Sequence, residues 1–443
     1  MEYRLPYGSA FLNLRAPDHL DVREFRPRRF ERAGPDTLLE NALESPTGSP
    51  VLERLVSKQD RILILSDDAT RPTPVHRILP AILRRLTARG IPKNRIRILM
   101  AYGLHKPMDQ TALSLKLGAS ILSEFPVIHH DAFKEKDLFR AGETSSGSAV
   151  YLNRALFESD LTMAIGNLSL SKEAGYGGGA KIVMPGAAGA ETIYASHAKV
   201  AHHPNQVGKI EGNPIRREIE ECGKMGNLRF TVNTILDEKD EICRVVAGDP
   251  AAAFRKGVSQ FNDVYRFQLE RPLDLLVVSS SPMDGDFYQA NKALTVSSLG
   301  VRDEGMIILA APCTSGLSPF RYFDDMITSA RTFSQWHDLM CRPGFQHQVA
   351  AEICLGLRYL MDVRRISIGM VTTGIRPDTV AGMGLVPFPT LESALESALR
   401  RLGRNALAGI VPKGPLTLFE ASGTSFPRFN RTGSTDSHAG LTP

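Results

Sequence analysis

Short apolar runs that each end in a polar or glycine-containing loop constrain the fold of this chain more than any other feature. In the first half, the runs Arg61–Ser66, Ile96–Tyr102 and Leu161–Gly166 have the length of buried parallel strands. The segment Val75–Arg89 between the first two runs has the apolar spacing of a helix and ends before Gly90. Alternation of strand, loop and helix is typical of doubly wound α/β folds, in which ligands bind beyond the carboxyl ends of the strands.

The pattern returns in the second half of the chain. Leu273–Ser279, Met306–Ala311 and Ile366–Thr372 are predicted strands, and Leu391–Leu402 is a predicted helix. A chain of 443 residues is too long for one compact core. We therefore predict an α/β protein with two domains, both with mostly parallel sheets, and an active site in the cleft between them.

The predicted boundaries are residues 1–268 for the first domain and 269–422 for the second. Tyr3–Leu14 is expected to form short strands, and Val258–Leu269 is expected to link the domains. Residues 423–443 are rich in Ser, Thr, Gly and Pro and are predicted to be a disordered tail.

Composition excludes several classes of function. The chain is 42% hydrophobic and 23% charged with a net charge of +5, and it has no basic stripe of the kind that binds nucleic acid. It has no apolar stretch of signal-peptide or membrane-span length, which favours a cytoplasmic protein without a membrane partner. The five cysteines are scattered and lack CxxC spacing, so we expect neither a disulfide framework nor a cysteine-built zinc site.

A glycine-rich loop, Gly175–Gly186, carries Lys181 and is the strongest candidate for a binding site. Glycines allow a close approach of backbone to a ligand, and a lysine amine can bind phosphate or serve as a covalent anchor. The loop matches neither the Walker pattern nor GxGxxG. His197 follows on the segment Ala190–Ala198 and is a plausible metal ligand, whereas the adjacent pair His202-His203 is expected to be exposed.

Polar groups after the predicted strands provide further candidates, each with a structural alternative. Arg71 offers a planar fork for carboxylate or phosphate, and Asp68 could bind ribose hydroxyls or hold Arg71; a structural turn is an equal alternative. His105 could be a general base, although a lone histidine is more often structural. Gln289 and Lys292 would share one face of a helix and could reach a substrate anion, or they could simply begin a polar helix.

Taken in order, these segments resemble the nickel-dependent lactate racemase family from the N-terminus to about residue 420. Tyr288-Gln289 with Lys292 is similar to the substrate motif of the family's second domain. The other motifs that carry the resemblance are Ser66–Pro72, Gly103–Pro107, Ala174–Lys181, Pro185-Gly186 with Glu191-Thr192-Ile193, and Gly212–Arg216.

The resemblance implies a cofactor and a set of site residues. The cofactor is a nickel-pincer nucleotide, the pyridinium-3-thioamide-5-thiocarboxylic acid mononucleotide with nickel, held noncovalently or covalently at Lys181, with His197 as a nickel ligand. Cofactor-biosynthesis proteins are implied partners. The implied cofactor-binding residues are Lys181, Asp68, Thr70, Arg71, Tyr176, Gly177, Gly178 and Gly179. The implied catalytic residues are His105, Arg71, Lys292, Gln289 and Lys172. The implied substrate-binding residues are Arg71, Tyr288, Gln289, Lys292 and Ser171.

The implied activity is racemisation or epimerisation of a 2-hydroxy acid by proton-coupled hydride transfer. In this family a second catalytic histidine is expected where this chain has Ser171, and serine is not a base unless it is activated. Lys172 or Glu173 could replace it, the substrate could be a hydroxy acid other than lactate, or the protein could bind cofactor or hydroxy acid without turnover. An ordinary phosphate-binding α/β enzyme, with the glycine loop as an anion nest, is a third alternative.

Overall fold

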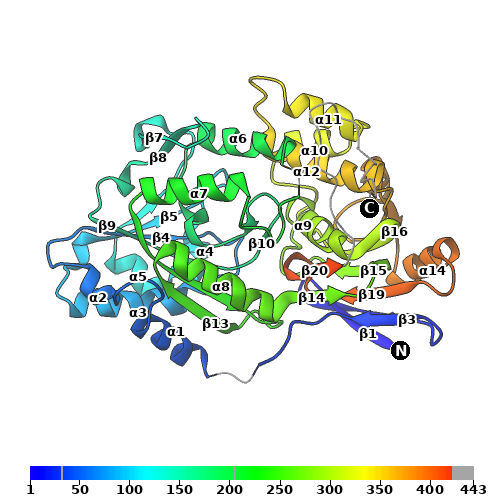
Figure 1. Ribbon diagram of the computed structural model, residues 1–443, viewed down its shortest axis with the longest axis horizontal. Helices are drawn as coiled ribbons and strands as arrows, with labels where there is room; N and C mark the ends of the chain where they lie inside the picture. Colours follow the sequence, from blue (N-terminus) through cyan, green and yellow to red (C-terminus); the bar gives the residue numbers. More distant parts are fainter. Residues whose placement is uncertain (31–32, 204, 422–443) are drawn as a thin grey trace, which may run out of the picture. The chain divides into compact units, whose positions relative to one another are not determined.

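The computed structural model describes residues 1–30, 33–203 and 205–421, which form two compact units (Figure 1). Unit 2 comprises Pro27–His197 and Gln206–Tyr265. Unit 1 comprises Met1–Arg26, Ala198–Asn205 and the residues from Arg266 onward. The predicted boundary near residue 268 lies close to the observed one, but the division is discontinuous, because the first strands of the chain pair and pack with the C-terminal segment.

Unit 2 is built on a six-stranded sheet in the order β13-β12-β9-β4-β5-β6. All neighbouring strands are parallel except β12 and β13, which are antiparallel. The central strand β4 is buried along its full length, as its continuous apolar sequence predicts. The strands are β4 (Ile62–Ser66), β5 (Ile96–Met100), β6 (Val127–His129), β9 (Leu161–Asn167), β12 (Leu228–Leu236) and β13 (Ile242–Gly248).

Helices of unit 2 pack on this sheet through periodic apolar side chains. In α3, the predicted face with Ile78, Leu79 and Ile82 is buried in one cluster with Ile62 and Ile64 of β4. Helix α8 contacts β12 and β13 (Figure 1). The helices are α1 (Pro35–Glu44), α2 (Leu52–Leu55), α3 (Val75–Ala88), α4 (Gln110–Leu117), α5 (Ala119–Glu124), α6 (Ala190–Ala198), α7 (Pro214–Met225) and α8 (Pro250–Tyr265).

Two small antiparallel pairs complete unit 2. One is β7 (Leu138–Glu143) with β8 (Ala149–Asn153), and the other is β10 (Leu170–Ser171) with β11 (Gly175–Tyr176). The second pair brackets the loop that contains Lys172 and Glu173. Short 3-10 helices lie at η1 (Lys93–Arg95), η2 (Glu135–Asp137), η3 (Arg154–Leu156) and η4 (Gly179–Ile182), and η5 (Lys199–Ala201) lies in the segment that belongs to unit 1.

Unit 1 has a six-stranded, fully parallel sheet in the order β18-β17-β16-β15-β19-β3. Strand β3, from the start of the chain, pairs with β19 near its C-terminal end. Outside this sheet, β1 (Glu2–Tyr7) pairs with β2 (Ala10–Arg15), and β14 (Arg266–Leu269) pairs with β20 (Leu418–Ala421). The sheet strands are β3 (Asp21–Glu24), β15 (Leu273–Ser279), β16 (Val301–Ala310), β17 (Ser367–Val371), β18 (Val386–Phe388) and β19 (Leu407–Val411).

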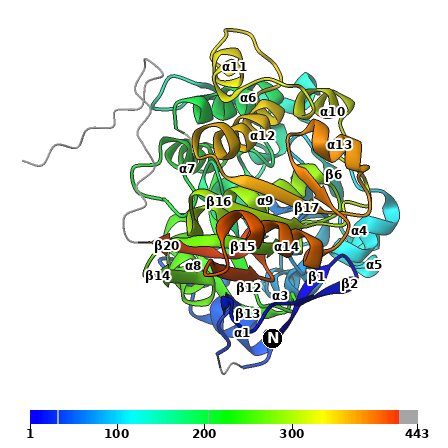
Figure 2. The ribbon, with the colours of Figure 1, turned by 90° about the vertical axis from the view of Figure 1, so that its right-hand side faces the viewer.

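Alternate residues of β15 serve two different cores. Leu276 and Val278 pack with helix α9, whereas Leu275 and Val277 pack with α14, so helices cover both faces of the sheet. Figure 2 shows α14 lying across the strands of unit 1. The helices are α9 (Phe287–Ser297), α10 (Arg321–Ile327), α11 (Phe333–Met340), α12 (Gln348–Arg358), α13 (Pro377–Gly382) and α14 (Leu391–Leu402), with η6 (Ser298–Gly300), the π-helical η7 (Tyr359–Val363) and η8 (Gly414–Leu416).

The α/β class with two mostly parallel sheets is thus as predicted. The segment Val258–Leu269, predicted to link the domains, contains the junction between Tyr265 of unit 2 and Arg266 of unit 1. It consists of the end of α8 and all of β14, and Phe261, Val264 and Tyr265 in it are buried. The predicted disordered tail, residues 423–443, lies outside the described residues. Within the described ranges, no helix is long and apolar enough to span a membrane, and none of the five cysteines forms a disulfide.

Candidate functional site

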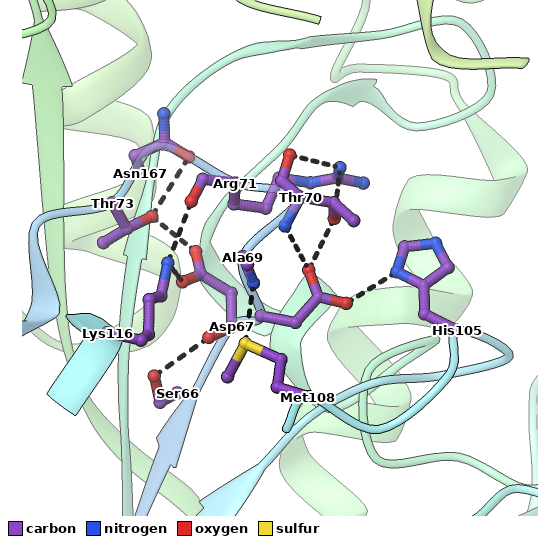
Figure 3. A network of polar contacts seen from close by, with 11 residues as sticks. Ser66, Asp67, Ala69, Thr70, Arg71, Thr73, His105, Met108, Lys116 and Asn167 are labelled. Atoms are coloured by element: carbon purple, nitrogen blue, oxygen red, sulfur yellow. Dashed lines mark hydrogen bonds and ion pairs between the residues drawn. The ribbon is translucent and has the colours of Figure 1, made fainter. Parts of the chain in front are cut away.

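The loop after β4 holds two aspartates that face different partners (Figure 3). Asp67 forms an ion pair with Lys116, with 2.7 Å between Oδ1 and Nζ, and accepts a hydrogen bond from the Thr73 hydroxyl. Lys116 also donates to the Arg71 carbonyl at 2.9 Å. Burial raises the pKa of Asp67, and the charge of Lys116 opposes that rise. Asp67 and Lys116 therefore fix the loop that presents Asp68 and Arg71.

Asp68 orients His105 across two neighbouring strand ends. Its Oδ2 lies 2.7 Å from His105 Nδ1, and its Oδ1 accepts hydrogen bonds from the backbone amide of Thr70, at 2.9 Å, and from the Thr70 hydroxyl. Burial opposes ionisation of Asp68, but the hydrogen bonds and the charges of His105 and Arg71 outweigh it and hold the pKa of this carboxyl below its usual range. Asp68 is therefore a carboxylate at neutral pH.

The second ring nitrogen of His105 points away from Asp68 (Figure 3). The backbone of this loop is held by a hydrogen bond from His105 N to the Tyr102 carbonyl, 2.9 Å, and by one from Gly103 N to the Gly186 carbonyl, 2.9 Å. Gly103 has a φ of +56°, which favours glycine at this turn. An imidazole that is anchored through Nδ1 to a carboxylate, with Nε2 directed elsewhere, has the arrangement of a general base.

Lys181 lies in a second cluster of polar groups, within the same unit. Its amine forms an ion pair with Glu173 and donates a hydrogen bond to Ser171 Oγ at 3.1 Å. Burial lowers the pKa of Lys181, and the charges of Arg216 and Arg71 add to this effect, while Glu173 opposes it. Arg71 and Lys181 therefore act on one another, which connects the Asp68 loop to the glycine loop.

Glu173 connects Lys181 to His197. Burial raises the pKa of this carboxyl, but the positive charges of Lys181 and His197 lower it well below its usual range. His197, at the end of α6, has Nδ1 at 2.8 Å from the Ile193 carbonyl. When Nδ1 donates this bond, Nε2 is left as the metal-binding atom, an arrangement found for most histidine ligands.

The glycines of the loop are required by packing within the protein. Gly178 and Gly179 have φ values of +84° and +60°. A Cβ on Gly178 would lie 2.8 Å from the Leu168 side chain, and one on Gly179 would lie 2.9 Å from Phe254. On Gly177 it would lie 2.5 Å from Ser169 Oγ. Contact of these three glycines with a cofactor stays a prediction, because neighbouring protein atoms already explain why no side chain fits there.

The side chain of Tyr176, a predicted cofactor-binding residue, is directed into the core. It is 1% exposed, its hydroxyl donates to Asn262 at 2.8 Å, and its ring packs edge-on against Phe261. Its carbonyl accepts a hydrogen bond from Arg216, whose Nε also donates to the Ala174 carbonyl at 3.1 Å. Contact of Tyr176 with a cofactor stays a prediction.

The other predicted residues are divided between the two units. Lys172 is half-buried between β10 and β11, next to Glu173. Gln289 and Lys292 lie on α9 of unit 1, three residues apart as predicted, and both are half-buried. The Tyr288 ring packs against Phe320 and Phe323, with centroids 5.6 and 5.3 Å away. The predicted set thus has Tyr288, Gln289 and Lys292 in unit 1 and its other members in unit 2.

Sequence reasoning missed the part played by Lys116 and Arg216 in holding these loops. Lys116 belongs to α4, where a lysine is usually a solvated helix residue, yet its side chain is 7% exposed. Arg216 begins a helix after Asn213-Pro214 and is 2% exposed. Arg216 lies within the Gly212–Arg216 motif, but nothing in the sequence near Lys116 signals burial.

Two family models match the chain in order. The lactate racemase N-terminal domain matches residues 7–208, and the lactate racemase C-terminal domain matches residues 270–417. The lactate racemase of Thermoanaerobacterium thermosaccharolyticum is 26% identical over 424 residues, covering 93% of this chain and 97% of that protein. The lactate racemase of Lactiplantibacillus plantarum is 28% identical over 397 residues, covering 85% and 89%.

Solved structures share the fold. The lactate racemase apoprotein of T. thermosaccharolyticum superposes with a TM-score of 0.85 at 24% identity, over 95% of this chain and 100% of that chain. A crystal structure of a Thermotoga maritima protein gives a TM-score of 0.68 at 20% identity, over 89% and 100%. Because both domain models match in order over most of its length, the chain belongs to the lactate racemase family.

Proposed function

We propose that this protein is a racemase or epimerase of a 2-hydroxy acid that uses a nickel-pincer nucleotide as its cofactor. One observation carries the proposal: the carboxylate of Glu173 is ion-paired with Lys181 and is also under the electrostatic influence of His197, whose Nδ1 lies 2.8 Å from the Ile193 carbonyl. Membership of the lactate racemase family supports the reaction class. The substrate and the mechanism are parts of the proposal.

The residues of unit 2 fit such a cofactor in charge and in ligand type. The charges of Arg71 and Arg216 both act on Lys181, which provides a positive region for the phosphate of a nucleotide. His197 offers the imidazole that nickel accepts beside sulfur ligands, and Lys181 would hold the nucleotide. Lys181 would meet the phosphate as an ammonium in a noncovalent complex, and burial, which lowers the pKa of its amine, eases the proton loss that a covalent link requires. When bound, the cofactor would accept a hydride from the substrate carbon and return it.

His105 is the proposed base for the substrate hydroxyl. Asp68 binds Nδ1, so Nε2 is the atom that takes the proton, and the adjacent carboxylate stabilises the imidazolium that results. When the hydride returns to the flat keto carbon, the same Nε2 can give the proton back. Arg71, which lies next to this pair, is the proposed binding group for the substrate carboxylate.

The second proton carrier is proposed to be Lys172. Ser171 is 5% exposed and its Oγ already accepts hydrogen bonds from Ala174 N and Lys181 Nζ. Glu173 is ion-paired with Lys181 and has a lowered pKa, which makes it a weak base. Lys172, which is half-buried beside these two residues, is proposed because a lysine amine can give and take a proton. Gln289 and Lys292 are proposed to bind the substrate anion.

A second function is binding of cofactor or hydroxy acid without turnover. It is favoured because the Ser171 hydroxyl already accepts two hydrogen bonds within the protein. With one anchored histidine and an engaged serine, proton transfer would serve only one orientation of the substrate hydroxyl. A protein of this kind would retain nickel but leave the configuration of every 2-hydroxy acid unchanged.

The test is to produce the protein together with cofactor-biosynthesis proteins and to measure nickel content, intact mass and chiral conversion. We expect close to one nickel per chain and inversion of at least one member of a panel of 2-hydroxy acids and sugar acids. A substrate carrying deuterium on the hydroxyl-bearing carbon should keep its label through inversion, because a hydride that returns to the same carbon does not exchange with water.

The Lys181→Ala and His197→Ala variants separate the alternatives. Both should lose nickel, and a mass adduct present in the parent should vanish in Lys181→Ala. Nickel without inversion of any substrate would favour the binding protein. A parent chain without nickel, or one that keeps its nickel in both variants, would rule out the proposed cofactor site and favour an ordinary phosphate-binding enzyme.

A further inference from the structure

Two histidines and a cysteine meet in unit 1, apart from the residues of the proposed active site. Their ligand atoms, one from each of His202, His337 and Cys341, all lie within 4.8 Å of one another. The Cys341 sulfur is 3.9 Å from His202 Nε2 and 4.0 Å from His337 Nε2. It is the one group of this kind found among the residues that the structure describes.

The positions of these three residues in the backbone bring their side chains together. His337 and Cys341 are four residues apart on α11 and its C-cap, and residues at this spacing lie on the same face of a helix. His202 comes from the segment Ala198–Asn205, which also belongs to unit 1. The rings of the two histidines are nearly perpendicular, at 88°, with centroids 6.2 Å apart, so they do not stack on each other.

The distances are close to those of a bound metal. In a tetrahedral zinc site, with Zn–S near 2.3 Å and Zn–N near 2.0–2.1 Å, sulfur and nitrogen ligands lie about 3.6 Å apart. The two sulfur–nitrogen distances here exceed that value by about 0.3–0.4 Å. His202 and Cys341 are exposed and His337 is half-buried, so side-chain rotations can bring the three ligand atoms closer together.

We propose that His202, His337 and Cys341 form a binding site for a borderline-soft divalent metal, with zinc as the ion that fits best. One thiolate and two imidazoles are ligands that zinc prefers, and three protein ligands leave the fourth position of a tetrahedron to water. The site lies outside the proposed nickel cofactor site, and it does not depend on the proposed function.

A redox role explains the cluster less well. Among the described residues, Cys341 forms no disulfide with a second cysteine. Two imidazoles directed at one sulfur are instead what a metal requires.

Metal binding would join two segments that are far apart in the sequence. His202 follows His197 by a few residues, whereas α11 lies well over a hundred residues later. A metal held by both would fix the start of the segment that leaves α6. We therefore expect zinc to stabilise unit 1 and to protect Cys341 from alkylation.

The test uses the full chain made without cofactor and carrying His197→Ala, so that the proposed nickel ligand is absent. After chelation and reduction, the protein is titrated with zinc, and separately with cobalt(II), whose bond to a thiolate gives a near-ultraviolet charge-transfer absorption. We expect one equivalent to bind with this absorption. Loss of an outer-shell partner alone weakens metal binding by roughly 10–100-fold, so Cys341→Ser and His337→Ala should each weaken it by about 100-fold or more.

His203→Ala is the matched control. His203 is adjacent to His202, is likewise exposed, and is not part of the cluster, so this variant should bind zinc as the parent does, whereas His202→Ala should not. Because His202, His203 and Cys341 are exposed, the variants at these three positions should melt at the same temperature as the parent without metal. No cobalt–thiolate absorption in the parent, or an absorption that survives Cys341→Ser, would overturn the proposal.

Discussion

The two six-stranded sheets share an architecture but differ in the side chains that lie just after their strands. In unit 2, the loops after β4 and β5 carry Asp67, Asp68 and His105, which are held by ion pairs and charge-assisted hydrogen bonds. In unit 1, β15 ends in hydroxyl groups that bind backbone: Ser279 donates to the Pro6 carbonyl at 2.6 Å, and Ser280 donates to the Ala310 carbonyl at 3.3 Å.

This difference supports the proposal that proton transfer takes place at the strand ends of unit 2. Burying a charged group costs free energy unless the group is paired. Buried, paired charges at strand ends are therefore typical of functional sites, where reactive groups are held at some cost in stability. Hydroxyl groups that donate to backbone carbonyls of the protein have a structural role. We therefore expect changes in unit 2 to alter cofactor retention and turnover, and changes in unit 1 to alter substrate affinity or stability alone.

The largest expected effect is that of His105→Ala. Loss of the proposed base should lower kcat by about 10²–10⁴-fold, since that is the usual contribution of a general base, while nickel content stays unchanged. Turnover and nickel should be measured on the same preparation. His76→Ala is a suitable control, because His76 is an exposed histidine at the start of α3. Normal turnover in His105→Ala would contradict the assignment of chemistry to unit 2.

Two buried arginines permit a matched comparison of the units. Arg216 in unit 2 donates to the carbonyls of Ala174 and Tyr176, and Arg364 in unit 1 donates to those of Ser298 and Val301. A lysine cannot reach both carbonyls, and a hydrogen bond to a charged group contributes about 1.5–3 kcal/mol. Arg216→Lys and Arg364→Lys should therefore each lower the free energy of unfolding by about 3 kcal/mol.

Only one of these two variants should affect the cofactor. Arg216 holds the strand pair next to Lys181, so Arg216→Lys should also reduce nickel retention in folded protein, whereas Arg364→Lys should not. Denaturant titration gives the stability, and metal analysis of the folded fraction gives the retention. Equal nickel loss in both would show that retention depends on stability rather than on the local geometry of unit 2.

Lys292→Ala tests the contribution of unit 1 to substrate binding. Removing one charge that binds the substrate anion should raise KM by about tenfold, with kcat and nickel content little changed, because the interaction is made equally in ground and transition states. Steady-state kinetics on whichever hydroxy acid proves to be the substrate would measure this. A large fall in kcat at constant KM would instead give Lys292 a part in the chemical step.

The smallest expected effect is a pH dependence of stability. The folded-state pKa of Asp68 is lowered, so its contribution is present above the ordinary carboxyl pKa near 4 and is lost as pH falls toward the lower folded-state value. We expect Asp68→Asn to be less stable than the parent by on the order of 1 kcal/mol at pH 7, with the difference shrinking below about pH 4. A difference that grows on acidification would show that the carboxylate is not stabilised in the fold.

Strands and helices with strong local patterns could be predicted from the sequence. The runs at Leu273–Ser279 and Leu391–Leu402 match β15 and α14 residue for residue, and the run beginning at Ile96 forms β5. The prediction extended β5 two residues too far, to Tyr102, because a strand that runs into a buried loop keeps its apolar character. An apolar sequence pattern indicates which residues are buried, and the buried residues after β5 continue beyond the last hydrogen-bonded residue of the strand.

Long-range pairing could not be predicted in the same way. Strand β3, Asp21–Glu24, has no apolar run, and it is a strand because β19 pairs with it. At the site, the sequence pointed to Asp68, His105, Lys181 and His197, but not to the buried ion pair between Asp67 and Lys116. Whether a charged side chain is solvated or buried depends on elements that are distant in sequence, so local composition does not reveal it.

The pairing of β3 with β19 has a consequence for synthesis of the chain. The ribosome makes β3 among the first residues, while β19 appears only near the other end. Unit 2, whose segments end at Tyr265, is complete well before that point. During translation, the leading segment therefore lacks its partner strand until the C-terminal part of the chain has been made, so the sheet of unit 1 can be completed only after unit 2 has been synthesised.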